Sequence, residues 1–261
     1  MSRAAGSLVV VGTGIQLGGQ ITVEALDAIR RADCVPYFVA DTHAARWIES
    51  LNPHAENLAR LYAPGKPRLD TYREAVEHIV GLVRAGHRVC TAFYGHPGVF
   101  AYPGHEAVAR VRAAGLPARM LPAVSALDCL VADLGLDPGQ TGLQSYEATH
   151  FLQREPPVDA HALLVLWQVG MIGEAGGAAT PGVGARFREL IERLREQFGA
   201  EREALLYEAS PYPGARSAAA LFRLGDADLP TPSPVSTLCV PADTTPPIDV
   251  EARGLIALSR C

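Results

Sequence analysis

Short apolar runs and stretches of helical spacing alternate along the first part of this chain. Residues 8–11 form a β-branched apolar run that ends in a glycine-rich turn at residues 12–14. Val23, Leu26 and Ile29 then recur at the spacing of one helix face. The pattern predicts a strand, a glycine loop and a helix.

The next segments continue this alternation with one gap. Residues 34–40 are predicted to form a second strand, whereas residues 41–67 mix polar and aromatic positions without a clear period. Thr71 and Glu74 have the spacing of a capping box, and Gly86 stands where a glycine commonly ends a helix. We therefore expect a helix from Thr71 to about Gly86.

Strand and helix signals also follow this helix and continue through the second half of the chain. Further elements are predicted as strands at 89–93, 162–167 and 204–207, helices at 104–114, from Ser125 and at 186–198, and a closing pair of strands within 221–240. Because strands and helices alternate, the sheet should be mostly parallel. A Gly/Ala-rich loop at 173–184 is predicted to be mobile.

Composition and charge exclude several classes of protein. The chain has 261 residues, of which 48% are hydrophobic and 20% charged, so it can bury a large core without disulfides. Its net charge is −5, and its Lys and Arg residues are scattered, which argues against nucleic acid as a partner. No apolar run is long enough to span a membrane, and the first residues do not resemble a signal peptide. We expect a cytoplasmic protein.

The cysteines and histidines do not indicate a metal site. Cys34, Cys90, Cys129 and Cys239 are far apart and lie among apolar neighbours, as buried thiols do. Cys261 is expected to be an exposed free thiol. The eight histidines form neither an HExxH motif nor a cluster with cysteine. We therefore predict no metal.

Two glycine-containing turns are candidates for ligand binding. The loop at residues 12–14 lacks the third glycine of the dinucleotide fingerprint, and no acidic residue at convincing spacing follows it, so a nicotinamide cofactor is disfavoured. Residues 93–100, Phe-Tyr-Gly-His-Pro-Gly-Val-Phe, follow a buried strand and could bring backbone groups close to a ligand. A tight turn capped by His96 would explain the same residues.

Several segments resemble one known family. Residues 9–14, 21–22 and 32–33 are similar to the opening of the tetrapyrrole methylases. Within that superfamily, four further segments resemble the borosin peptide α-N-methyltransferases, namely residues 94–100, 120–126, 146–148 and 167–170. The likeness covers about residues 8–240. The resemblance implies an α/β fold of two lobes, with a mostly parallel sheet in the N-terminal lobe (1–121), a mixed sheet in the C-terminal lobe (122–241) and a tail (242–261).

The resemblance also implies a cofactor, a substrate and a set of site residues. The methyl donor would be S-adenosylmethionine, which leaves as S-adenosylhomocysteine, and the acceptor would be backbone amides of a ribosomally made precursor peptide bound by a homodimer. The donor pocket would be lined by Tyr94, His96, Val99, Phe100, Ser125, Ala126, Gln168, Tyr207, Ser236 and Thr237. The catalytic set would be Tyr62, Arg68, Tyr72 and Tyr94. Because the chain stops soon after Val240, we predict that a separate precursor is methylated in trans.

These residue types suit methylation of an amide. The nitrogen lone pair is delocalised into the carbonyl, so the amide needs help to become a nucleophile. Arg68 and Tyr72 are spaced i, i+4 and could together hold the carbonyl oxygen, while Tyr62 is the candidate base. A nearby guanidinium and the donor's sulfonium should lower the pKa of Tyr62.

Other interpretations of these residues remain open. Tyr62, Arg68 and Tyr72 could be ordinary surface, cap and core residues. Tyr102, Tyr212 and Trp47 could line a peptide channel or simply pack. The acceptor could instead be a tetrapyrrole or another small molecule, although the first loop lacks the Gly-Pro-Gly-Asp sequence usual there. The chain could also be a peptide-binding homologue without turnover.

Overall fold

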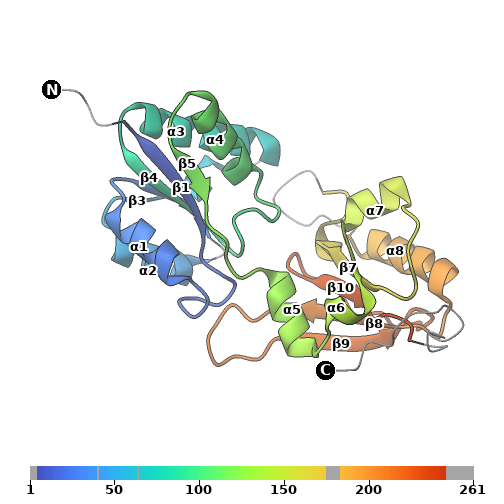
Figure 1. The fold of residues 1–261 in the computed structure, drawn as a ribbon. Coiled ribbons are helices and arrows are strands. Elements are labelled where there is room, and N and C mark those ends of the chain that lie inside the picture. Colours follow the sequence, from blue (N-terminus) through green and yellow to red (C-terminus); the bar gives the residue numbers. More distant parts are fainter. Residues whose placement is uncertain (1–4, 40, 64, 175–182, 245–261) are drawn as a thin grey trace, which may run out of the picture.

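The protein folds into two α/β lobes, each built on a five-stranded sheet (Figure 1). The computed structural model describes residues 5–39, 41–63, 65–174 and 183–244. The core of the predicted loop at 173–184 and most of the predicted tail, with Cys261, lie outside the described residues. The chain passes from the first sheet to the second between Met120 and Ala126.

The N-terminal lobe is a parallel sheet covered on both faces. Its strands run in the order β3-β2-β4-β1-β5, and every pair is parallel. The strands are β1 (Ser7–Gly12), β2 (Val35–Phe38), β3 (Ala55–Asn57), β4 (Arg88–Phe93) and β5 (Ala118–Met120). The helices are α1 (Val23–Arg31), α2 (Thr42–Leu51), the 3-10 helix η1 (Leu58–Leu61), α3 (Arg68–Arg84) and α4 (Tyr102–Ala113).

Alternating side chains of the interior strand β1 explain why helices cover both faces. Val10 packs with α3 and α4 on one face, and the adjacent Val11 packs with α1 and α2 on the other. A strand buried on both sides must be apolar at consecutive positions, which is the run seen at residues 8–11. The predicted parallel sheet is confirmed.

One helix boundary differs from the prediction. The helix α3 begins at Arg68, and its cap residue Pro67 makes no side-chain capping bond. Thr71 is therefore inside the first turn and fully buried, while Glu74 pairs with Lys66 at 2.6 Å. The capping-box prediction was wrong because burial of Thr71 against the core outweighs its capping preference. The predicted end is confirmed, since Gly86 follows the cap residue with φ +92°.

The stretch at 41–67 holds regular structure that its sequence pattern did not reveal. It contains α2, β3 and η1. Asp41 caps α2, and its carboxylate accepts hydrogen bonds from the backbone N–H groups of His43 and Ala44 at 2.7 and 2.9 Å. These elements are only three to ten residues long, so each is too short to show a clear period.

The C-terminal lobe carries a mixed sheet of strand order β6-β7-β10-β8-β9. Only β6 and β7 are parallel, and the other pairs are antiparallel. Its elements are α5 (Ala126–Leu134), α6 (Pro138–Thr141), β6 (Leu143–Glu147), α7 (Ala148–Arg154), β7 (Leu163–Trp167), η2 (Val169–Met171), α8 (Val183–Phe198), β8 (Glu203–Glu208), β9 (Ala218–Arg223) and β10 (Thr237–Val240). The predicted closing strands β9 and β10 do not pair with each other but flank β8.

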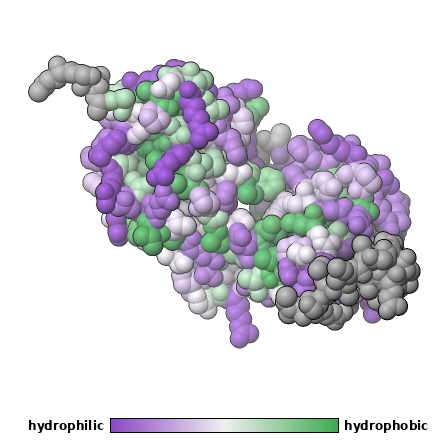
Figure 2. All heavy atoms as spheres, viewed as in Figure 1, coloured by the Kyte–Doolittle hydropathy of each residue, from purple (hydrophilic) through white to green (hydrophobic). Residues whose placement is uncertain are grey.

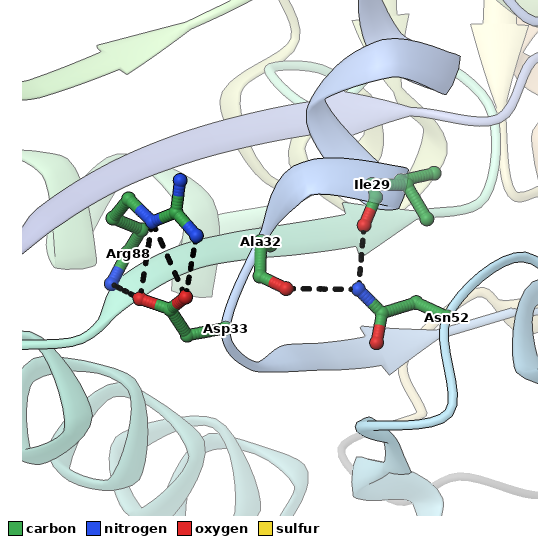
Figure 3. A network of polar contacts seen from close by, with 5 residues as sticks. All are labelled: Ile29, Ala32, Asp33, Asn52 and Arg88. Atoms are coloured by element: carbon green, nitrogen blue, oxygen red, sulfur yellow. Dashed lines mark hydrogen bonds and ion pairs between the residues drawn. The ribbon is translucent and has the colours of Figure 1, made fainter.

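Two polar contacts fasten the turn between α1 and β2 (Figure 3). The buried Asn52 donates from Nδ2 to the carbonyl oxygens of Ile29 and Ala32 at 2.8 and 3.0 Å, which satisfies the end of α1. The carboxylate of Asp33 accepts from the guanidinium of Arg88 at 2.7 Å and from its backbone N–H at 2.8 Å. The start of β4 is thereby tied to the start of β2.

The surface is mostly hydrophilic on the outer sides of the two lobes, with apolar residues visible where the lobes approach each other (Figure 2). No helix within the described residues is both long and apolar enough to cross a lipid bilayer.

Candidate active site

A large cleft lies where the two lobes meet, with a volume of about 1080 Å³. It is lined by the loop that follows β4, the start of α5, the segment from β6 to α7, the loop after β7, and residues of β8 and β10. The carboxyl end of β4 opens onto it, which is where ligands bind in sheets of this kind.

The cleft brings together most of the residues expected to bind the donor. These lining residues are Tyr94, His96, Val99, Phe100, Ser125, Ala126, Gln168, Tyr207 and Thr237. Ser236 differs, because it is fully buried and its hydroxyl donates a hydrogen bond to the carboxylate of Glu208 behind the wall. From sequence alone, Ser236 could not be distinguished from its neighbour Thr237.

The glycine loop after β1 supports the loop after β4. The two loops are bridged by hydrogen bonds between the backbones of Gly14 and Gly95 at 3.0 and 3.3 Å. A Cβ on Gly12 would lie 2.1 Å from the carbonyl oxygen of Gly95, so only glycine allows this approach. Gly95 itself has φ +69°. The glycines at residues 12–14 therefore seat the ligand-facing loop against the first strand.

Hydrogen bonds hold several lining side chains in place. Nδ1 of His96 accepts from the backbone N–H of Gly98 at 3.0 Å, so its Nε2 is the ring position that can donate. The Tyr207 hydroxyl donates to Asp133 at 2.6 Å, and burial raises its pKa. Nε1 of Trp167 donates to Ser145 at 2.6 Å. Such fixed side chains shape the cleft before a ligand arrives.

Two loops of the C-terminal lobe are locked together behind the cleft. A Cβ on Gly170 would lie 1.8 Å from the carbonyl oxygen of Ser233, so the loop carrying Gln168 touches the loop carrying Pro234 backbone to backbone. The backbone N–H of Ser233 donates to the hydroxyl of Ser236 at 2.7 Å. Gln168 has φ +58°, a left-handed conformation rare for a side chain of its kind.

Two of the expected catalytic residues, Tyr62 and Tyr72, belong to an aromatic cluster at the carboxyl ends of β2 and β4. Tyr62 and Tyr72 both meet the edge of Phe38, at ring distances of 6.2 and 6.3 Å, and Phe38 stacks on Phe93 at 6.0 Å. Phe38 and Phe93 are paired at the ends of β2 and β4, and Tyr94 comes next in the chain. Tyr94 alone of the expected catalytic set lines the cleft.

The pKa values of Tyr62 and Tyr94 are raised, whereas a lowered pKa was expected for Tyr62. Burial raises the pKa of Tyr62, and the charge and hydrogen bond of Tyr72 raise it further, while Arg68 lowers it. The predicted lowering was wrong for the protein by itself because one guanidinium does not offset burial. Burial likewise raises the pKa of Tyr94 to about 12, with smaller contributions from Cys129 and Asp41.

The residues proposed for a peptide channel do not line the cleft as the described residues form it. Tyr212 is held on the surface by a hydrogen bond from its hydroxyl to Asp41 at 3.0 Å. Tyr102 is 41% exposed at the start of α4, and Trp47 lies on α2 near Gly18.

Sequence reasoning missed one wall of the cleft. Tyr146, Glu147, His150 and Arg154 line it from β6 and α7, and Trp167 lines it from β7. Tyr146, Glu147 and Trp167 lie in segments that carried the family resemblance, which was a usable signal. His150 and Arg154 share an i, i+4 spacing that could have placed them on one face.

Comparison with protein families decides which group the chain belongs to. The sequence model of the Tetrapyrrole (Corrin/Porphyrin) Methylases matches residues 7–226, which covers both lobes. The chain is a member of this family. The fold agrees with this membership, because a uroporphyrin-III-C-methyltransferase from Thermus thermophilus superposes with a TM-score of 0.62 at 22% identity over 98% of this chain and 99% of the other.

Curated relatives extend the resemblance to the borosin group. A protein of Omphalotus olearius, named as methyltransferase and precursor of the ribosomally synthesised cyclic peptide omphalotin A, is 45% identical over 209 residues, 80% of this chain and 50% of the relative. The corresponding dendrothelin A protein of Dendrothele bispora is 44% identical over 208 residues, again 80% and 50%. A type I borosin precursor of Mycena rosella is 37% identical over 261 residues, 97% and 65%. This chain thus spans about half the length of the first two relatives.

Proposed function

We propose that this chain is an S-adenosylmethionine-dependent methyltransferase that N-methylates backbone amides of a ribosomally made peptide. The observation that carries the proposal is the cleft between the lobes, because it gathers nine of the ten residues expected to bind the donor. Its lining residue Tyr94 directly follows Phe93, which belongs through Phe38 to the same ring cluster as Tyr62 and Tyr72. Membership of a methylase family and relatives named as methyltransferase and peptide precursor support both parts of the proposal.

The lining residues suit the donor chemically. Phe100 and Val99 offer apolar surface for a purine, while Ser125, Gln168 and Thr237 offer hydroxyl and amide groups for a ribose and an amino acid. The close backbone approach at Gly12 and Gly95 fixes the position of the loop after β4, whose side chains line this space. When bound, S-adenosylmethionine supplies an electrophilic methyl group on a positively charged sulfur.

The protein's own task is to make the amide nitrogen nucleophilic. Arg68 begins α3, and Tyr72 lies one turn later on the same face, so both can donate to an acceptor's carbonyl oxygen. Donation there stabilises the charge that develops on oxygen as the nitrogen lone pair is released. Arg68 and Tyr72 are thereby assigned to the carbonyl oxygen.

Tyr62 is assigned to the amide proton. Its hydroxyl is hydrogen-bonded to Tyr72, and its raised pKa means that it holds its proton at neutral pH. A cation close by lowers the pKa of a phenol, and Arg68 already acts in that direction. The added positive charge of the donor would strengthen this effect and allow Tyr62 to accept the amide proton.

The test is incubation of the purified 261-residue chain with S-adenosylmethionine and the precursor peptide encoded beside its gene, followed by fragmentation mass spectrometry. Methyl groups located on backbone amides would support the proposal, and methylation of the added peptide would also support supply in trans, which stays a prediction of the sequence. Binding of S-adenosylhomocysteine without any peptide methylation would contradict the peptide acceptor and favour a small-molecule one.

The homodimer is also a proposal, resting on the borosin resemblance. Light scattering should report twice the chain mass, and a mass of one chain at every concentration would contradict the dimer.

A further inference from the structure

One wall of the cleft is formed by β6 and α7, and none of the residues expected to bind the donor lies on it. We call it the α7 wall, and its members are Ser145, Tyr146, Glu147, His150, Arg154 and Pro156. The cleft volume of about 1080 Å³ lies at the upper end of the roughly 300–1,000 Å³ usual for one small ligand. Space beside this wall is therefore available to a second group.

The orientation of α7 directs two nitrogen-bearing side chains into the cleft. His150 and Arg154 are one turn apart and both line the cleft. Ala148 and Phe151 lie on the opposite side of the helix and are buried in the core of the C-terminal lobe. Because that side is anchored, the helix cannot rotate His150 and Arg154 away from the cleft.

The carboxylates close to Arg154 in the chain are engaged elsewhere. Glu155 binds Arg193 on α8 at 2.6 Å. Glu147 is the N-cap of α7, and its two carboxylate oxygens accept from the Thr149 hydroxyl and from the backbone N–H of His150, each at 2.8 Å. Within the described residues, the guanidinium of Arg154 has neither an ion pair nor a hydrogen bond. A positive charge with open donor positions thus faces the cleft.

We infer that the α7 wall is a carboxylate-binding subsite, with Arg154 as the principal cation and His150 as a second donor. The inference deepens the proposed function and rests on it. A guanidinium binds a carboxylate through two parallel N–H donors, a geometry that lysine cannot reproduce. The carboxylate is either an acidic side chain of the acceptor peptide or the amino-acid carboxylate of the donor, and the two sources give different results in the following experiment.

The first arm tests the donor as the source. Calorimetry measures the affinity of wild type, Arg154→Gln and Arg154→Lys for S-adenosylhomocysteine and for 5′-methylthioadenosine, which lacks the amino-acid part. If the donor's carboxylate binds here, Arg154→Gln lowers the affinity for S-adenosylhomocysteine by about tenfold or more but leaves the affinity for 5′-methylthioadenosine unchanged. Arg154→Lys should restore only part of the loss. Arg188→Gln, on an exposed position of α8 outside the cleft, is the matched control.

The second arm tests the peptide as the source. Two synthetic peptides of alanine, serine and valine differ only in one central glutamate or glutamine, and their binding is measured with S-adenosylhomocysteine saturating. If the peptide's carboxylate binds here, wild type prefers the glutamate peptide, and Arg154→Gln removes the preference of about tenfold while Arg188→Gln keeps it.

The outcomes separate the subsite from the proposed function. Unchanged affinities of Arg154→Gln in both arms, with a melting temperature like that of wild type, would overturn the subsite. If wild type binds neither peptide, the peptide source is excluded and the first arm alone decides the subsite. Suppose that Arg154→Gln loses affinity for S-adenosylhomocysteine alone and that the wild-type chain methylates no peptide. This result would support the subsite and contradict the peptide acceptor.

Discussion

Residues that are neighbours in the sequence differ in their place at the cleft. One lines the cleft, and the next packs behind it. Thr237 faces the cleft, whereas Ser236 turns inward to Glu208 and holds the loop from behind. Tyr94 lines the cleft, whereas the adjacent Phe93 stacks on Phe38 inside the aromatic cluster. At a strand end, consecutive side chains point to opposite sides, so function alternates with packing.

If Arg68 and Tyr72 bind the acceptor's carbonyl oxygen as proposed, their loss should stop methylation without stopping donor binding. We expect Arg68→Gln and Tyr72→Phe each to lower the methylation rate by about a hundredfold or more, because the developing charge on the acceptor oxygen loses a donor. Neither residue lines the donor cleft, so affinity for S-adenosylhomocysteine should stay near that of wild type. Single-turnover assays and calorimetry measure the two effects. Normal methylation by both variants would refute the assigned roles.

The backbone contact at Gly170 should be sensitive to a single methyl group. Gly170→Ala places a Cβ 1.8 Å from a backbone oxygen, and we expect a loss of about 2–3 kcal/mol in the free energy of unfolding. The matched change Gly81→Ala lies in α3 with open space around it and should stabilise by about 0.5–1 kcal/mol. Urea denaturation distinguishes them, and changes of the same sign would contradict this account.

At the scale of elements, short polar contacts decide how the strands of the first lobe meet the helices. Asn52 satisfies the last carbonyls of α1 from the end of α2, and Asp33 joins the turn before β2 to the start of β4. These contacts span 20 to 55 residues of sequence, so neither partner has a local pattern that predicts the other. They link α1, α2, β2 and β4, and the pairing of β2 with β4 places Phe38 beside Phe93.

The Asp33 contact predicts a pH-dependent loss of stability. Its hydrogen bonds to Arg88 lower the pKa of Asp33 to about 2, so its stabilisation is complete above the ordinary value of 3.8 and is lost as pH falls toward 2. Asp33→Asn should lower the melting temperature by about 1–3 °C at pH 7 and by much less at pH 2. Asp27→Asn, which removes an exposed pair within α1, is the control. An equal difference at both pH values would contradict the assignment.

At the scale of the whole molecule, the two lobes share an apolar layer under the cleft. Ile15 from the first lobe packs in the same cluster as Leu163, Val165 and Tyr207 of the second. Phe100 from the first lobe meets the edge of Trp167 from the second at 6.1 Å. Because these contacts cross between lobes, the shape of the cleft depends on both sheets being formed.

Fully and partly buried tyrosines should make the whole molecule sensitive to alkali. Burial raises the pKa of Tyr94 from its ordinary value of about 10 to about 12, and it also raises the pKa values of Tyr37, Tyr62 and Tyr207. The stabilisation is complete below pH 10 and is lost as pH rises through the folded-state values. Melting temperatures should therefore fall steeply above about pH 10. The melting temperature of Tyr94→Phe should fall less than that of wild type over this pH range. An equal fall in both proteins would contradict the burial of Tyr94.

The sequence by itself determined the alternation of strands and helices, the parallel sheet, the helix from Ser125 and the family. These follow from local periodicity and from motifs such as residues 94–100, where one strand end and its turn are contiguous. The start of α3, the inward turn of Ser236, the raised pKa of Tyr62 and the α7 wall were decided only by tertiary structure. Each of them depends on what packs against the residue from a distant part of the chain, and burial of that kind outweighs local preference.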